Sequence, residues 1–336
     1  MKSYTKQELL NFFNSEFINQ YDLWVPIKLH DGTRSLGKLD DGELVLIGDL
    51  MPMKPTSLFA PCSEVVFKFT KDGEILPQPS LDKPMFIVGF TAQDLDCLEF
   101  IDRFFSRNYR DEVYFAKRAF AIIVGVSGYV GSDNGFFKIA GKNCDIELIS
   151  HAENQYFVCP ISKKGHEIAS FIPGGTEIDD KTFNALQQKS DNLEDKDLEI
   201  LIKASKLVLE NKVPDEFWKS VSDRCIACTA CTLLCPTCTC FDVFDRKCAL
   251  NSDISFERCR MRDSCQLDGF MREASGHNPM GKEFLRTRRR IHHKIAADVL
   301  RWGHMTCYLC GRCDLACPSG IGIKSVCREL VEKYGE

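Results

Sequence analysis

The sequence lacks the features that mark several common classes of protein. Its longest apolar stretches, such as residues 120–126, are far shorter than the roughly 20 residues that a membrane-spanning helix needs. The N-terminus has neither the apolar segment of a secretory signal nor a twin-arginine signal. The net charge is −5, so no excess of basic residues favours a nucleic-acid partner. These absences predict a cytoplasmic protein with no membrane span.

Nucleotide-binding and catalytic motifs are also missing. The chain contains no GxxxxGK[ST] sequence and no convincing nucleophile triad. Residues 125–131 carry three glycines after an expected strand, but their spacing is not GxGxxG and no basic residue follows to meet a phosphate. We interpret this stretch as a turn, and we predict no catalytic residue in the chain.

Cysteine is scarce in the first two thirds of the chain and abundant afterwards. Of the 18 cysteines, 14 follow Arg224. The spacing of the other four matches no ligand pattern, so we expect structural thiols at Cys62, Cys97, Cys144 and Cys159. Such a density in a secreted chain would indicate disulfides, but the missing signal sequence points to a reducing compartment. The dense region is therefore expected to bind metal.

The dense region contains one cysteine pattern twice. The spacing C-x2-C-x2-C-x3-C-P occurs at residues 225–236 and again at 307–318. This repeat is typical of two-cluster [4Fe–4S] ferredoxins, in which the fourth cysteine of each run ligates the other cluster. Zinc sites also use C-x2-C pairs, but they have no use for the repeated third and fourth cysteines. The predicted ligands are Cys225, Cys228, Cys231 and Cys317 for one cluster, and Cys307, Cys310, Cys313 and Cys235 for the other.

Further cysteines raise the question of a third cluster. Cys238 and Cys240 form a C-x-C pair directly after the first run, and Cys265 would add a third thiolate. Cys259 is the preferred fourth ligand, with Cys248 as the alternative. The competing interpretation is that these residues are buried free thiols, which pack as small hydrophobic side chains.

The order of expected elements predicts an α+β protein of two domains. Apolar strands at 84–89 and 120–124, with a helix at 92–107 between them, indicate an α/β domain over residues 1–213. The N-terminal helix is expected at 3–20, with Thr5 and Glu8 as a capping box. The 71 residues between the two cysteine runs include a helix expected at 283–302. This long insertion favours an all-helical, two-cluster ferredoxin-like domain over residues 214–336.

The expected helix at 283–302 begins with a basic run, residues 286–294. This run is either a solvated helix face or a source of positive charge near the anionic clusters. In the second case it would stabilise the reduced clusters or bind an acidic partner.

Residues 225–323 resemble the iron–sulfur electron-transfer component of anaerobic sulfite reductase and the beta subunit of sulfhydrogenases. The resemblance rests on ordered motifs in five short stretches: residues 235–243, 263–265, 276–278, 285–294 and 307–313. The first domain matches only loosely, around residues 88–95, and it lacks the C-x-C stretch that the family usually carries there. The resemblance implies an electron-relay chain that works with two separate partners, a flavin- and NAD(P)H-binding subunit and a catalytic redox subunit.

The sequence therefore predicts an electron-transfer subunit of a cytoplasmic multi-subunit oxidoreductase with two [4Fe–4S] clusters and a candidate third. The alternative is a reductase subunit in which an open third iron–sulfur site binds substrate. A zinc-stabilised scaffold that only tethers partners is a further option.

Overall fold

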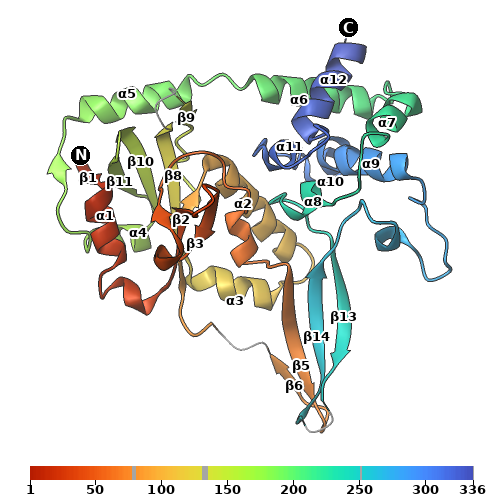
Figure 1. Cartoon of the computed structure of the whole chain (residues 1–336), viewed down its shortest axis with the longest axis horizontal. Helices are drawn as coiled ribbons and strands as arrows, with labels where there is room; N and C mark the ends of the chain where they lie inside the picture. The colour runs from red at the N-terminus through yellow and green to blue at the C-terminus, as the bar shows by residue number, and fades with distance from the viewer. Residues whose placement is uncertain (78–80, 131–134, 250–251, 336) are drawn as a thin grey trace. The chain divides into compact units, whose positions relative to one another are not determined.

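The computed structural model describes residues 1–77, 81–130, 135–249 and 252–335. These residues form two compact units (Figure 1). The N-terminal unit comprises Met1–Phe59 and Ser80–Glu194, and the C-terminal unit comprises Ala60–Pro79 and Asp195–Glu336. Among the described residues, no helix has both the length and the apolar character needed to cross a bilayer.

A mixed sheet forms the centre of the N-terminal unit, in the order β12-β1-β11-β10-β8-β7-β2-β3, with β4 paired to β2 and β9 to β8. Strands β10, β8, β7 and β2 run parallel to their neighbours within this group, and the other pairings are antiparallel. The strands are β1 (Lys2–Thr5), β2 (Asp22–Lys28), β3 (Arg34–Gly37), β4 (Glu43–Leu44), β7 (Met85–Phe90), β8 (Ile122–Val130), β9 (Gly135–Phe137), β10 (Ile146–Ala152), β11 (Gln155–Pro160) and β12 (Thr176–Glu177).

Successive side chains of a strand point to opposite faces of the sheet, so each apolar face packs against helices. In β11, Tyr156 and Val158 join the core cluster that contains helix α1, whereas Phe157 and Cys159 pack with Leu186 of helix α5. The helices are α1 (Lys6–Phe13), η1 (Ile18–Gln20), η2 (Leu39–Asp41), η3 (Pro55–Leu58), α2 (Ala92–Ser106), α3 (Glu112–Phe120), α4 (Lys163–Ala169) and α5 (Asp180–Asp191). A sheet-containing N-terminal region therefore fits the expectation.

Two local expectations in this unit need correction. The helix expected at 3–20 begins only at Lys6, because residues 2–5 pair with β11 as strand β1; the capping box of Thr5 and Glu8 is present. The glycine-rich stretch is not a turn, because its described residues 125–130 belong to β8, while Gly131 lies outside the described residues. Gly128 has φ +93°, and a Cβ there would lie 2.1 Å from the Ser150 carbonyl oxygen. Glycine is needed here for close strand packing.

The all-helical description of the C-terminal region is not confirmed. The insertion between the cysteine runs contains strands β13 (Phe241–Lys247) and β14 (Ile254–Arg262), which form an antiparallel hairpin. Strand β14 also pairs with β5 (Ser63–Thr70), which pairs with β6 (Ile75–Pro77), so residues 60–79 join this unit. The compact units thus have other boundaries than the expected domains, 1–213 and 214–336. Whether each expected range folds as a domain stays a prediction.

The helices of the C-terminal unit surround a core of aliphatic side chains and Trp218, which is 1% exposed. The expected helix at 283–302 is interrupted by a π-helical segment, η5. The helices are α6 (Lys196–Leu209), α7 (Asp215–Ser222), α8 (Ala230–Leu233), η4 (Asp268–Met271), α9 (Glu283–His292), η5 (His293–Ala297), α10 (Asp298–Trp302), α11 (Arg312–Leu315) and α12 (Ile323–Tyr334).

Candidate metal centre

The two cysteine runs adopt the same backbone conformation. Ala227 and Leu309, at equivalent positions, have φ of +52° and +57°. Thr229 and Gly311, two residues further on, have φ of +64° and +77°. A short helix follows each loop, α8 after the first and α11 after the second. Left-handed backbone is costly for residues other than glycine and is concentrated at functional sites. The sequence repeat is therefore also a structural repeat.

The first run lines a cavity together with the last cysteine of the second run. Four cysteines line this cavity, Cys225, Cys228, Cys231 and Cys317. The structure thus brings together the four cysteines that were predicted to share one cluster; their ligation of iron stays a prediction. Burial raises the pKa of Cys231 to about 11. A thiolate at this position therefore needs positive charge beside it.

Backbone N–H groups point at several of the cysteine sulfurs. The Ala227 N–H donates to Cys225 Sγ (3.4 Å), and in the second run the Leu309 N–H contacts the Cys307 thiol. The Ile321 N–H donates to Cys317 Sγ (3.4 Å). Hydrogen bonds to ligand sulfurs are one way in which proteins set the potential of an iron–sulfur cluster. The donor set therefore fits cubane clusters.

The second predicted ligand set lies around a different part of the unit. The Cys307 thiol interacts with Cys235 and Cys310, and the Cys313 thiol also interacts with Cys235. Burial raises the pKa of Cys307 to about 12. Thr237 Oγ1 donates to the Thr306 carbonyl (2.7 Å) and so ties the segment after Cys235 to the start of the second run.

The candidate third group is only partly assembled. Cys240 donates to Cys265, which lowers the pKa of Cys265 to about 6 despite its burial, and Cys238 interacts with Cys240. Cys259 does not lie with them, because it pairs with Phe244 while the Asp263 N–H bonds to the Cys240 carbonyl. Four residues of strand separate these positions, about 14 Å at 3.4 Å per residue.

The remaining cysteines lie in varied surroundings. Cys97, Cys144, Cys159 and Cys327 are buried, whereas Cys62 is exposed and Cys248 is intermediate. Cys62 belongs to the C-terminal unit, and its carbonyl accepts a hydrogen bond from the Arg262 N–H. The Arg262 side chain in turn donates to the Cys238 carbonyl. The N-terminal position of Cys62 in the sequence gives no indication of this placement.

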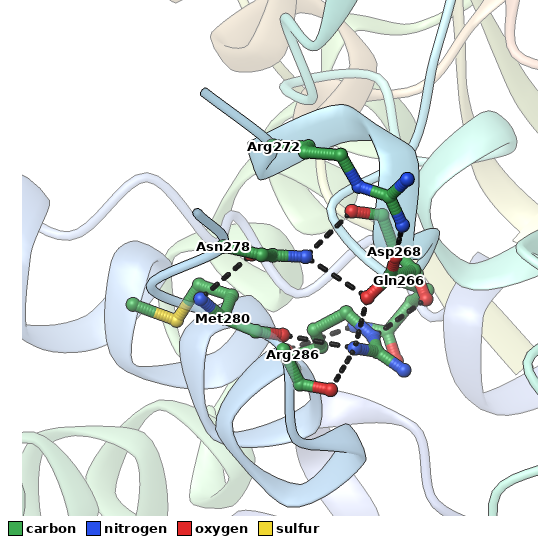
Figure 2. Close-up of polar contacts among 7 residues, drawn as sticks. Gln266, Asp268, Arg272, Asn278, Met280 and Arg286 are labelled. Atoms are coloured by element: carbon green, nitrogen blue, oxygen red, sulfur yellow. Dashed lines mark hydrogen bonds and ion pairs between the residues drawn. The ribbon is translucent and has the colours of Figure 1, made fainter. Parts of the chain in front are cut away.

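Arg286 organises the segment between the hairpin and helix α9 (Figure 2). Its guanidinium donates to the carbonyls of Gln266 (3.1 Å), Met280 (2.8 Å) and Gly281 (3.0 Å). Asn278 donates to the Asp268 carbonyl (2.8 Å) and accepts from the Met280 N–H. The motifs at 263–265, 276–278 and 285–294 therefore meet in one network.

This network places Gln266 at the first cavity. Its amide Nε2 donates to the Arg286 carbonyl (3.0 Å), and the side chain lies 3.8 Å from Cys225 Sγ. Gln266 lines the cavity with the four cysteines, as do Thr287 and Arg290. Sequence reasoning missed Gln266, although it directly follows Cys265 in a motif of the family.

Arg290 supplies a further sign that the cavity suits an anionic group. Its side chain is 5% exposed and Nη2 donates to the Ile321 carbonyl (2.5 Å). Among the described residues, no hydrogen-bond acceptor for the buried Nη1 is found. A buried guanidinium nitrogen without an acceptor is costly unless a ligand supplies one. Cluster sulfide and thiolate would supply it.

Comparisons with known proteins agree with this chemistry. Residues 224–321 match a family model described as a 4Fe-4S dicluster domain. The chain is 26% identical to the sulfhydrogenase 2 subunit beta of Pyrococcus furiosus, over 94% of this chain and 96% of that protein. No solved structure matches. Residues 224–321 are thus similar to a 4Fe-4S dicluster domain, and the chain is similar, along nearly its whole length, to the beta subunit of a sulfhydrogenase.

Proposed function

We propose that this chain is the iron–sulfur electron-transfer subunit of a cytoplasmic multi-subunit oxidoreductase. It would relay electrons between two partners, a flavin- and NAD(P)H-binding subunit and a catalytic redox subunit of the sulfite reductase or hydrogenase kind. The observation that carries the proposal is the cavity lined by Cys225, Cys228, Cys231 and the distant Cys317. A crossed fourth ligand is the arrangement expected of two-cluster ferredoxins.

The protein's own part is to hold, orient and shield the clusters. When bound, each cluster accepts and releases one electron at a time. Cys225, Cys228, Cys231 and Cys317 would hold one cluster, and Cys307, Cys310, Cys313 and Cys235 the other. The backbone N–H groups at Ala227 and Ile321 would donate to the ligand sulfurs. No side chain is assigned a bond-making or bond-breaking role.

The first test is the iron and acid-labile sulfide content of anaerobically purified protein. Two cubanes require about eight of each per chain, and three require about twelve. Zinc without sulfide would overturn the proposal. Replacing Cys228 with Ala should halve a count of eight and leave the spectrum of one cluster. If both clusters remained after this replacement, the pairing of ligands would be wrong.

The electron-relay role needs a separate test in the assembled complex. The Cys228→Ala complex should still reduce its flavin with NAD(P)H but should lose electron transfer to the terminal acceptor. An unchanged rate of acceptor reduction would contradict a relay through this chain.

One observation favours a second candidate function. Cys265 is buried and accepts a hydrogen bond from Cys240, which lowers the pKa of Cys265. With Cys259 placed elsewhere, a third cluster here could keep an open position for substrate. Cyanide or sulfite that altered the electron paramagnetic resonance (EPR) spectrum of the wild type but not of Cys240→Ser would support this reductase function.

A further inference from the structure

Two buried cations lie one helical turn apart in the basic run between the cysteine runs. Arg290 is the third-last residue of α9, and Lys294 is the second residue of the π-helical segment η5. They are 5% and 3% exposed, so neither belongs to a solvated helix face. Burial of an unneutralised charge is strongly unfavourable. Each cation therefore needs an anionic partner inside the unit.

The surroundings of the two cations differ, although both lie near Cys238 and Arg290 also lies near Cys313 of the second ligand set. Arg290 lines the cavity of Cys225, Cys228, Cys231 and Cys317, with Nη1 lacking an acceptor among the described residues. Its Nη2 is anchored on the Ile321 carbonyl, which fixes the direction of the guanidinium. Nη1 is thus held in place as a donor at the first predicted ligand set.

Lys294 is anchored beside the second ligand set. Its Nζ donates to both the carbonyl and Oγ1 of Thr237, each at 2.7 Å. Thr237 lies two residues after Cys235, and the Lys294 carbonyl accepts from the Thr306 N–H, directly before Cys307. The ammonium thus holds the segments that present Cys235 and Cys307, and its charge lies near both thiols. A further negative group near Lys294 is Asp298, which is shared with His293 (3.2 Å).

We infer that Arg290 and Lys294 are fixed positive charges that raise the reduction potentials of the two clusters, Arg290 acting chiefly on the cluster of Cys225, Cys228, Cys231 and Cys317, whose cavity it lines, and Lys294 chiefly on the other. This inference rests on the proposed function. Reduction adds one negative charge to a cluster, so a nearby cation stabilises the reduced form. One cation of the basic run thus lies beside each predicted ligand set.

The π-helical segment offers a physical reason for this placement. A π-turn accommodates one extra residue and changes the direction of the side chains that follow it, and such turns are frequent at functional sites. Here the segment begins at His293, between Arg290 and Lys294. The two cations are therefore not forced to point at the same cysteines.

The test is an EPR-monitored redox titration of the full chain, with dithionite as the electron donor. Arg290→Gln and Lys294→Gln each remove one charge. Arg288→Gln is the control, since it removes the same charge from the same helix, where Arg288 pairs with Asp215 (3.0 Å). Each inward variant should shift one reduction wave to more negative potential by more than it shifts the other. The two variants should have their larger effect on different waves, and the control should shift neither.

Iron and sulfide counts separate the possible failures. A wild type without clusters would overturn the proposed function itself. Clusters present at wild-type count, with both waves unmoved in Arg290→Gln and Lys294→Gln, would overturn only this inference, as would a larger effect of both variants on the same wave. If Arg290→Gln fails to assemble its cluster, Arg290→Lys decides: it keeps the charge but loses the Nη1 donor and should show a smaller negative shift. A reduction wave at the wild-type potential in Arg290→Lys would contradict the role of Nη1.

Discussion

At the scale of single residues, identical chemistry leads to different roles according to position. Cys259 and Cys265 are both buried thiols of the C-terminal unit, and both follow the first cysteine run. Cys265 lies against Cys240 and near Arg290, whereas Cys259 lies within strand β14, opposite Phe244. Of these two cysteines, Cys265 is the one that contacts Cys240; its role as a metal ligand stays a prediction.

Replacing Cys259 with Ala should leave iron and sulfide content at the wild-type value. The expected cost is on the order of 1 kcal/mol in stability, because only one buried apolar-like atom is lost. Replacing Cys265 with Ala, the matched variant, should lower the iron content if a third cluster is present. Loss of iron from Cys259→Ala would contradict the strand register that separates Cys259 from Cys240.

At the scale of elements, the two cysteine loops are copies with one informative difference. The second left-handed residue is Thr229 in the first loop and Gly311 in the second. The β-branched threonine incurs the steric cost of a positive φ that glycine avoids. The surrounding structure must therefore hold the first loop in a conformation that its own sequence disfavours.

Gly311→Thr should destabilise the protein by about 1–2 kcal/mol, the usual cost of left-handed backbone for a residue with a Cβ. Thr229→Gly should change stability by less than about 1 kcal/mol, because relief of strain is offset by the greater freedom of glycine in the unfolded chain. The temperature at which the iron–sulfur absorbance is lost measures both. Equal effects of the two variants would show that the loops do not differ in strain as their sequences predict.

Much of the candidate site was predictable from local pattern. The repeated spacing predicts eight cysteine ligands, and the structure places four of these cysteines around one cavity. The cap at Thr5 and the start of the helix at Ala92 also follow from local sequence. These features depend on residues close together in the chain, so they can be predicted from a single sequence.

The parts that were missed depend on long-range pairing. The segment after the first cysteine run was placed in a helical insertion, yet strands β13 and β14 form a hairpin, and β14 pairs with strand β5, about 190 residues earlier in the chain. Gln266 at the cavity is held by hydrogen bonds with Arg286, 20 residues later in the chain. Such contacts cannot be read from periodicity, because strand pairing is set by tertiary packing.

At the scale of the whole chain, an early segment completes the sheet of the C-terminal unit. Arg260 on β14 donates to Glu64 of β5 through Nε (3.1 Å) and Nη2 (2.6 Å), with side chains 9% and 10% exposed. In the same sheet, Arg258 makes a similar forked contact with Asp245, but these side chains are 38% and 43% exposed. The two pairs share chemistry and differ in burial.

Burial should decide what each pair contributes to stability. Glu64→Ala leaves the Arg260 charge buried without its carboxylate and should cost about 3–5 kcal/mol. Asp245→Ala breaks an exposed pair that water can replace and should cost at most about 1 kcal/mol. Thermal unfolding of both variants, followed by circular dichroism, measures the difference. Equal losses of stability in the two variants would mean that β5 does not pair with β14 in solution. Residues 60–79 would then not be part of the C-terminal unit. A large loss of stability in Glu64→Ala alone is the result expected if residues 60–79 fold together with the C-terminal part of the chain.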